Sequence, residues 1–72
     1  MDSAGLQETF LNALRKGGIP TTFFLINGVQ MKGLVKAFDA YTVVVESAGQ
    51  QKLLFKHALS TLIPEERVEL RA

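Results

Sequence analysis

Lys56 and His57 stand side by side near the C-terminal end of the chain, and their types suggest a binding site. A lysine ammonium neutralises phosphate, and an imidazole can donate a hydrogen bond to a base or sugar oxygen. His57 is the only histidine, the chain has no cysteine, and no carboxylate pair stands near His57. A lone histidine without an orienting partner rarely catalyses a reaction. We therefore expect no enzyme activity, no cofactor and no metal. The alternative is a strand-end lysine and a locally hydrogen-bonded histidine.

The size of the chain predicts one small domain that needs partners. A domain of 72 residues buries only about 60% of the surface its unfolded chain exposes, so it usually needs a disulfide, a metal or self-association. The sequence offers no thiol and one histidine, which leaves self-association. Hydrophobic residues make up 47% of the chain, and we expect part of this surface to lie between subunits. No signal peptide or membrane span is visible, and the lack of cysteine fits a cytoplasmic protein.

The charge is modest but unevenly distributed. The formal net charge of +1 is low for a nucleic-acid binder. Residues 1–64 carry six basic and four acidic side chains, whereas residues 65–72 carry two basic and three acidic ones. The main part of the chain is therefore about +2, and we expect a strong field only if an oligomer gathers its cations on one face.

A single helix is expected before the strands. Residues 1–5 are expected to be flexible. From Leu6 onward, apolar residues recur at the spacing of one helical face, through Phe10 and Leu14. Gly17 and Gly18 supply a helix stop. A helix of this length is unstable alone, so it must pack on an apolar surface.

After Pro20 the pattern predicts five strands, at Thr21–Ile26, Val29–Phe38, Tyr41–Glu46, Gln51–Lys56 and Leu59–Ile63. Asn27-Gly28 is a strong tight-hairpin signal, and Gly33 indicates a sharp bend. The expected fold is mainly β with one N-terminal helix, a small and strongly bent five-stranded antiparallel barrel capped by the helix. The last strand is apolar and carries no charge, so we expect it to pair with a neighbouring subunit and close a ring.

Two segments carry a family resemblance. The run Phe55-Lys56-His57-Ala58-Leu59-Ser60-Thr61 resembles the second Sm motif of the Hfq family of Sm-like (LSm) bacterial RNA chaperones, which reads Tyr/Phe-Lys-His-Ala. Upstream, Leu25-Ile26-Asn27-Gly28, Gly33 and Phe38-Asp39 resemble the first Sm motif at matching spacing. The resemblance covers residues 6–64, which we take as an Sm-like domain followed by a short charged tail, 65–72.

The resemblance implies a proximal pore that meets uridine phosphates and base edges, formed by Gln7, Tyr41, Lys56 and His57. An aromatic plane can stack a base. Tyr41 is equally suited to packing at a subunit edge. Ala40 departs from the polar residue that is common in the family, which removes one side-chain contact.

The resemblance also implies a distal face that binds A-rich RNA, formed by Phe24, Gly28, Val29, Gln30, Met31, Lys32 and Thr61. Phe24 and Met31 would offer surfaces to adenines, and Gln30 and Thr61 would hydrogen-bond base edges. Phe24 stands where some relatives have tyrosine. The alternative is a plain hairpin whose apolar residues fill the barrel.

A third implied site is a rim formed by Asn12, Arg15, Lys16 and Phe38. Many relatives have an arginine-rich run here, but this chain has two cations, so we expect weaker RNA binding at the rim. The alternative is ordinary charge at a helix C-terminus. Asp39 is expected to accept backbone hydrogen bonds at a turn.

The resemblance implies a cytoplasmic homohexameric ring that binds the U-rich ends of small RNAs on one face and A-rich mRNA tracts on the other. Holding two RNAs would raise their effective concentration and promote their pairing. The alternative hypothesis is a small barrel that serves as a protein-interaction or assembly scaffold with little affinity for RNA.

Overall fold

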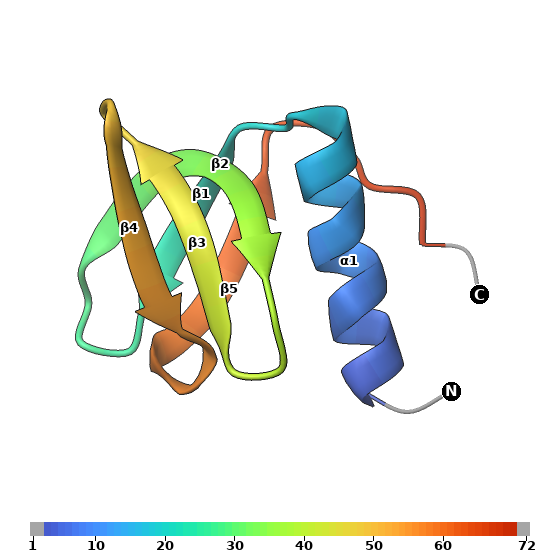
Figure 1. Ribbon diagram of the computed structural model, residues 1–72, viewed down its shortest axis with the longest axis horizontal. Coiled ribbons are helices and arrows are strands. Elements are labelled where there is room, and N and C mark those ends of the chain that lie inside the picture. Colours follow the sequence, from blue (N-terminus) through green and yellow to red (C-terminus); the bar gives the residue numbers. More distant parts are fainter. Residues whose placement is uncertain (1–2, 71–72) are drawn as a thin grey trace.

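The computed structural model describes residues 3–70, which form one helix and five strands in the predicted order (Figure 1). The elements are α1 (Ser3–Gly17), β1 (Thr21–Leu25), β2 (Gln30–Phe38), β3 (Thr42–Ser47), β4 (Gln50–Phe55), the 3₁₀ turn η1 (Lys56–Ala58) and β5 (Leu59–Pro64).

The helix α1 begins three residues earlier than predicted. Residues 3–5 belong to its first turn, while residues 1–2 lie outside the described range. The sequence favours this start because Ala4 is the strongest helix former and Ser3 is of a type preferred at helix starts. The helix ends as expected: Gly18 has a φ of +58°, and the N–H of Ile19 donates to the carbonyl oxygen of Leu14 at 3.1 Å.

The five strands form one antiparallel sheet in the order β4-β3-β2-β1-β5. The long strand β2 serves both halves: its first part pairs with β1 as far as Gly33, and its second part pairs with β3 from Leu34 onward. Figure 1 shows β2 arching between them. The fold class predicted from the pattern is therefore confirmed.

Gly33 lies where β2 passes from one pairing to the other. A Cβ atom at this position would lie 2.5 Å from the carbonyl oxygen of Glu46 and 2.7 Å from Cγ1 of Val45. Both distances are too short for a side chain, so the bend requires glycine.

The core lies between the inner face of the sheet and α1. Phe23, Val43 and Val45 are fully buried on the strands. Leu14 is fully buried on the helix. Burying one such side chain stabilises the fold by roughly 1.5–3 kcal/mol. The helix, which is too short to be stable alone, is thus held by its apolar face.

The two outer strands each have one strand neighbour within the described chain. β4 pairs with β3 and β5 pairs with β1, and the strand order places β4 and β5 at opposite ends of the sheet. Leu53 and Phe55 on β4 and Ile63 on β5 are all more than half exposed. Apolar strand edges of this kind favour pairing with another chain.

The segment after β5 returns toward α1 and is attached to the domain (Figure 1). The N–H of Glu65 donates to the carbonyl oxygen of Pro20 at 2.9 Å, and Val68 packs against the core. The first part of the charged tail is therefore fixed relative to the sheet.

Candidate nucleic-acid interface

Lys56 and His57 lie in the turn η1, where the chain leaves β4. The N–H of Lys56 donates to the carbonyl oxygen of Tyr41 at 2.8 Å, and the N–H of Leu59 donates to the carbonyl oxygen of Lys56. Lys56 was expected as the last residue of a strand, but it begins the turn instead. The turn thus presents two neighbouring polar side chains at one end of the sheet.

Aromatic rings contact the side chains of both Lys56 and His57. Nζ of Lys56 lies 5.7 Å from the centroid of the Phe38 ring, within cation–π range. The ring of His57 stacks on Phe55, with 5.7 Å between centroids and 19° between planes. His57 remains exposed, so its ring can still meet a ligand.

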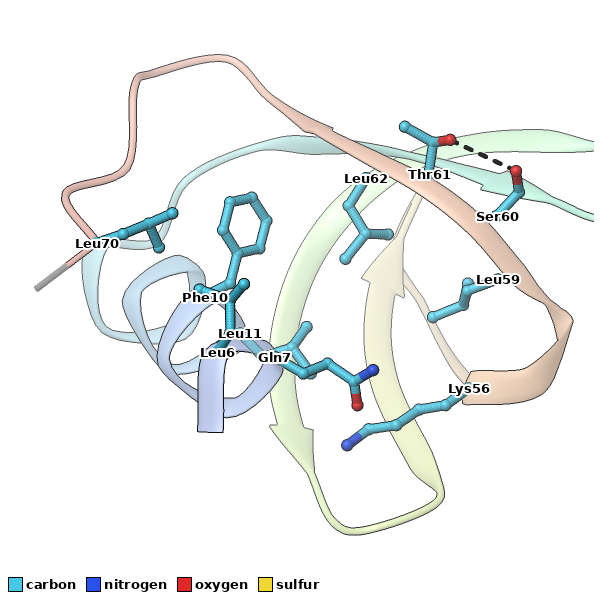
Figure 2. A pocket seen from close by; sticks show the side chains of 10 residues that line it. All are labelled: Leu6, Gln7, Phe10, Leu11, Lys56, Leu59, Ser60, Thr61, Leu62 and Leu70. Atoms are coloured by element: carbon cyan, nitrogen blue, oxygen red, sulfur yellow. Dashed lines mark hydrogen bonds between the residues drawn. The ribbon is translucent and has the colours of Figure 1, made fainter. Parts of the chain in front are cut away.

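Gln7 reaches the same place from the helix. Figure 2 shows the side chains of Gln7 and Lys56 pointing toward one another at one end of a groove between α1 and β5. The walls of this groove are mainly apolar and are formed by Leu6, Phe10, Leu11, Leu59, Leu62 and Leu70, with Ser60 and Thr61 beside them. The structure therefore brings Gln7 to Lys56 from a distant part of the chain.

Asp39 organises the turn that carries Tyr41. Its Oδ1 accepts hydrogen bonds from the N–H of Tyr41 at 2.9 Å, and from the N–H and hydroxyl of Thr42, each at 2.8 Å. The Tyr41 N–H, then the two Thr42 donors and the charge of Lys56, lower the pKa of Asp39 below its ordinary value. The turn role expected for Asp39 is confirmed. Tyr41 itself is 78% exposed, so its ring is available for stacking.

The second candidate surface lies on the outer face of β1, β2 and β5. Phe24 on β1 pairs with Gln30 on β2 and with Thr61 on β5. Two positions earlier on β1, Thr22 pairs with Lys32 on β2 and with Ile63 on β5. Side chains two residues apart share a face of a strand. The structure therefore gathers six side chains on one face of the sheet. We call these six residues the outer-face rows: Thr22, Phe24, Gln30, Lys32, Thr61 and Ile63.

Met31 does not belong to the outer-face rows, although it was expected to offer a surface to adenine. It pairs with Phe23, which is fully buried, and it packs against the core. Because strand side chains alternate between faces, Met31 points inward while Gln30 and Lys32 point outward.

Gly28 and Val29 lie in the hairpin loop beside the outer-face rows. Gly28 has a φ of +90°, a conformation that favours glycine. The N–H of Leu25 donates to the carbonyl oxygen of Val29 at 2.8 Å, which closes the loop. Val29 is about half exposed and directly precedes Gln30.

Lys32 has a partner that sequence reasoning missed. Its Nζ forms an ion pair with a carboxylate oxygen of Glu65, the residue directly after β5. The sequence contained no specific signal for this contact, because it depends on the order in which β5, β1 and β2 lie side by side.

Three of the four rim residues lie on α1, and the fourth, Phe38, is the last residue of β2. Asn12, Lys16 and Phe38 line a shallow groove on the helix, together with Gly5, Glu8, Thr9, Ala13 and Glu69. Arg15 lies beside it, and its Nη2 donates to Oδ1 of Asn12 at 2.6 Å. Two carboxylates in the lining, those of Glu8 and Glu69, reduce the positive field that Lys16 supplies.

Within residues 3–70, no group of three or more histidine, cysteine, aspartate or glutamate side chains is arranged to hold a metal ion. No helix in the described range is long and apolar enough to cross a membrane.

A capping helix on a strongly bent five-stranded antiparallel sheet is the Sm-like fold. A solved structure described as a crystal structure of the pleiotropic translational regulator Hfq superimposes with a TM-score of 0.78, at 38% identity, over 79% of this chain and 95% of that chain. The family model for Hfq protein matches residues 6–69, and the chain belongs to the Hfq family.

The curated relatives agree with this family. The chain is 51% identical over 69 residues to an RNA-binding protein Hfq from Halalkalibacterium halodurans, covering 96% of this chain and 88% of the relative. It is 59% identical over 59 residues to an RNA-binding protein Hfq from Clostridium perfringens, covering 82% of this chain and 74% of the relative.

Proposed function

We propose that this protein is a cytoplasmic RNA chaperone that holds two single-stranded RNAs on separate surfaces and so promotes the pairing of small RNAs with mRNAs. The observation that carries this proposal is the presence of two separate polar and aromatic surfaces on one Sm-like domain. One centres on Lys56 in the turn η1, and the other on Phe24 in the middle of the sheet. The relatives named as RNA-binding proteins support it.

The surface around Lys56 is suited to the uridine-rich ends of small RNAs. Lys56 supplies a cation for phosphate, and the exposed ring of Tyr41 supplies a stacking plane worth about 1–3 kcal/mol per base. His57 and Gln7 add hydrogen-bonding groups for a base edge. Gln7 and Lys56 lie at one end of a groove with mainly apolar walls, and this groove end is suited to an unpaired base.

The outer-face rows are suited to A-rich RNA. Phe24 offers a half-buried aromatic surface between Gln30 and Thr61, whose amide and hydroxyl groups can read base edges. Val29 and Gly28 border this surface on the hairpin side. Lys32 adds the cation that a passing phosphate requires.

Assembly into a homohexameric ring would complete both surfaces. The edges of β4 and β5 are at opposite ends of the sheet, so one copy can pair its β4 with the β5 of the next. Head-to-tail pairing closes when the rotation per subunit allows it. Repetition around a ring would concentrate the small net charge of one subunit into an annulus of Lys56 side chains.

Fluorescence anisotropy with labelled oligo-U and oligo-A tests the proposal. Lys56→Ala should weaken oligo-U binding while oligo-A binding is kept, and Phe24→Ala should do the reverse. Lys36→Ala is the matched control, because Lys36 is exposed and lies opposite Glu46 at 3.6 Å, outside both surfaces. If the assembled protein shows no salt-dependent binding to either RNA, the proposal fails, and the alternative of an assembly scaffold gains support.

A further inference from the structure

We propose that Glu65 is a built-in competitor for Lys32, and that it limits the affinity of the outer-face rows for single-stranded RNA. The inference rests on the proposed function and adds a residue to it. Lys32 is the only charged side chain among the six outer-face positions. Its Nζ is held by the carboxylate of Glu65. An RNA phosphate must therefore compete with that carboxylate before Lys32 can neutralise it.

The position of Glu65 is fixed by the fold. Its N–H donates to the carbonyl oxygen of Pro20 at 2.9 Å, directly after the last residue of β5. Three residues further on, Val68 packs against the core. The backbone of Glu65 is thus fixed by its own hydrogen bond and by the packing of Val68 after it. This places the Glu65 carboxylate beside β1 and β2.

The pair is arranged for competition more than for stability. The Lys32 and Glu65 side chains are 60% and 46% exposed, respectively. Ion pairs this exposed contribute little to folding, because water screens both charges. The same exposure allows a phosphate to reach Lys32, and it leaves the Glu65 carboxylate to repel that phosphate. Glu65 therefore affects RNA affinity strongly relative to its effect on folding.

Equilibrium titration of oligo-A with the assembled Glu65→Gln variant tests this inference. We expect binding that is about two- to fivefold tighter than wild type, the range that an exposed ion pair allows. We also expect a steeper salt dependence, by about 0.7 in log K against log[salt] for each additional phosphate neutralised. Oligo-U binding should not change, because the Lys56 surface lies on a different part of the fold.

Two controls separate competition from a general charge effect. Glu66→Gln makes the same change one residue away, at a carboxylate that forms no ion pair within residues 3–70, and it should not tighten binding. Glu65→Gln in a Lys32→Ala background should give no gain. Equal gains for Glu65→Gln and Glu66→Gln, or a gain that survives the loss of Lys32, would overturn the inference.

The result also distinguishes this inference from the proposed function. If the wild-type protein binds oligo-A and Glu65→Gln binds it with the same affinity, only the competitor role is overturned. Failure of the wild-type protein to bind oligo-A overturns the proposed distal function, and the competitor role with it. Thermal unfolding of each variant tests a purely structural role. If Glu65 were only structural, Glu65→Gln would lower the melting temperature without tightening RNA binding.

Discussion

The backbone N–H of Lys56 donates to the carbonyl oxygen of Tyr41 at 2.8 Å, so two residues fifteen positions apart share one hydrogen bond at one end of the sheet. The bond joins backbone atoms of both residues, and neither side chain takes part in it. The fold therefore holds the backbones of Lys56 and Tyr41 together without using either side chain in this bond.

Tyr41→Ala should weaken oligo-U binding without destabilising the fold. The ring is 78% exposed, so its removal costs little packing, but the lost stacking should cost about 1–3 kcal/mol per base. Tyr41→Phe keeps the aromatic plane and should bind nearly as well as wild type. Anisotropy titrations paired with thermal melts measure both effects. A large fall in melting temperature with unchanged binding would favour the alternative, in which Tyr41 packs at a subunit edge.

Gly33→Ala should destabilise the protein by about 1–3 kcal/mol, the usual cost of forcing an extra methyl group into a packed site. The new Cβ would meet the Glu46 carbonyl oxygen at 2.5 Å, and a backbone atom cannot move aside easily. Gly17→Ala is the matched control, because its closest contacts are side-chain atoms of Ile19 at 3.1 Å. Chemical denaturation measures the free energy of unfolding. Equal stability of the two variants would contradict the requirement for glycine at the bend.

Stability should depend on the charge of Asp39 at neutral pH and lose that dependence in acid. The folded state lowers the pKa of Asp39, so the ionised carboxylate stabilises the fold above the unfolded-state pKa, and this contribution disappears as the pH falls through the lower folded-state pKa. Asp39→Asn keeps a hydrogen-bond acceptor but removes the charge. Melting temperatures of wild type and Asp39→Asn should therefore differ most at neutral pH and converge in strong acid. A constant difference at every pH would show that the charge has no role.

Arg15→Ala with Lys16→Ala should slow the annealing of two complementary RNAs by no more than about tenfold, the low end of electrostatic steering. The groove that contains Lys16 also contains Glu8 and Glu69, and these two carboxylates already weaken the positive field in the wild-type protein. Glu8→Gln removes one of these carboxylates and should raise the annealing rate. Stopped-flow mixing of labelled strands measures the rate. If neither variant changes it, the rim makes no contribution to pairing.

Leu53→Glu should shift the protein from oligomer to monomer. Leu53 is 54% exposed on β4, one of the two outer strands, and a charge there would be buried without a partner when another strand pairs with β4. Gln50→Glu adds the same charge at the exposed start of β4 and should leave the assembly unchanged. Sedimentation or native mass spectrometry reports the mass. An unchanged oligomer in Leu53→Glu would place the subunit contact elsewhere.

The fold was largely predictable because short-range signals agreed with one another. The apolar spacing of Phe10 and Leu14, the Asn27-Gly28 hairpin and the bend at Gly33 all reappear in the structure. The helix start was placed too late because Ser3–Gly5 add no apolar residue to the helical face, and the periodic pattern begins only at Leu6.

The candidate site was less predictable because it depends on pairing between distant strands. The resemblance pointed to Lys56 and Gln7, and the structure brings them together. The resemblance also implied a distal-face role for Met31, but strand alternation turns this side chain into the core, beside Phe23. Glu65 was missed because its contact with Lys32 crosses β1, and nothing in the local sequence specifies which strands are neighbours.

The separation of β4 and β5 at opposite ends of the sheet has a genetic consequence. If copies join through these edges, every subunit takes part in two contacts, one on each side. A copy with one damaged edge and one intact edge could still enter an assembly but could not complete it. Substitutions confined to β4 or to β5 should then act dominantly in cells that also make the normal protein, whereas substitutions in the buried core, which prevent folding, should be recessive.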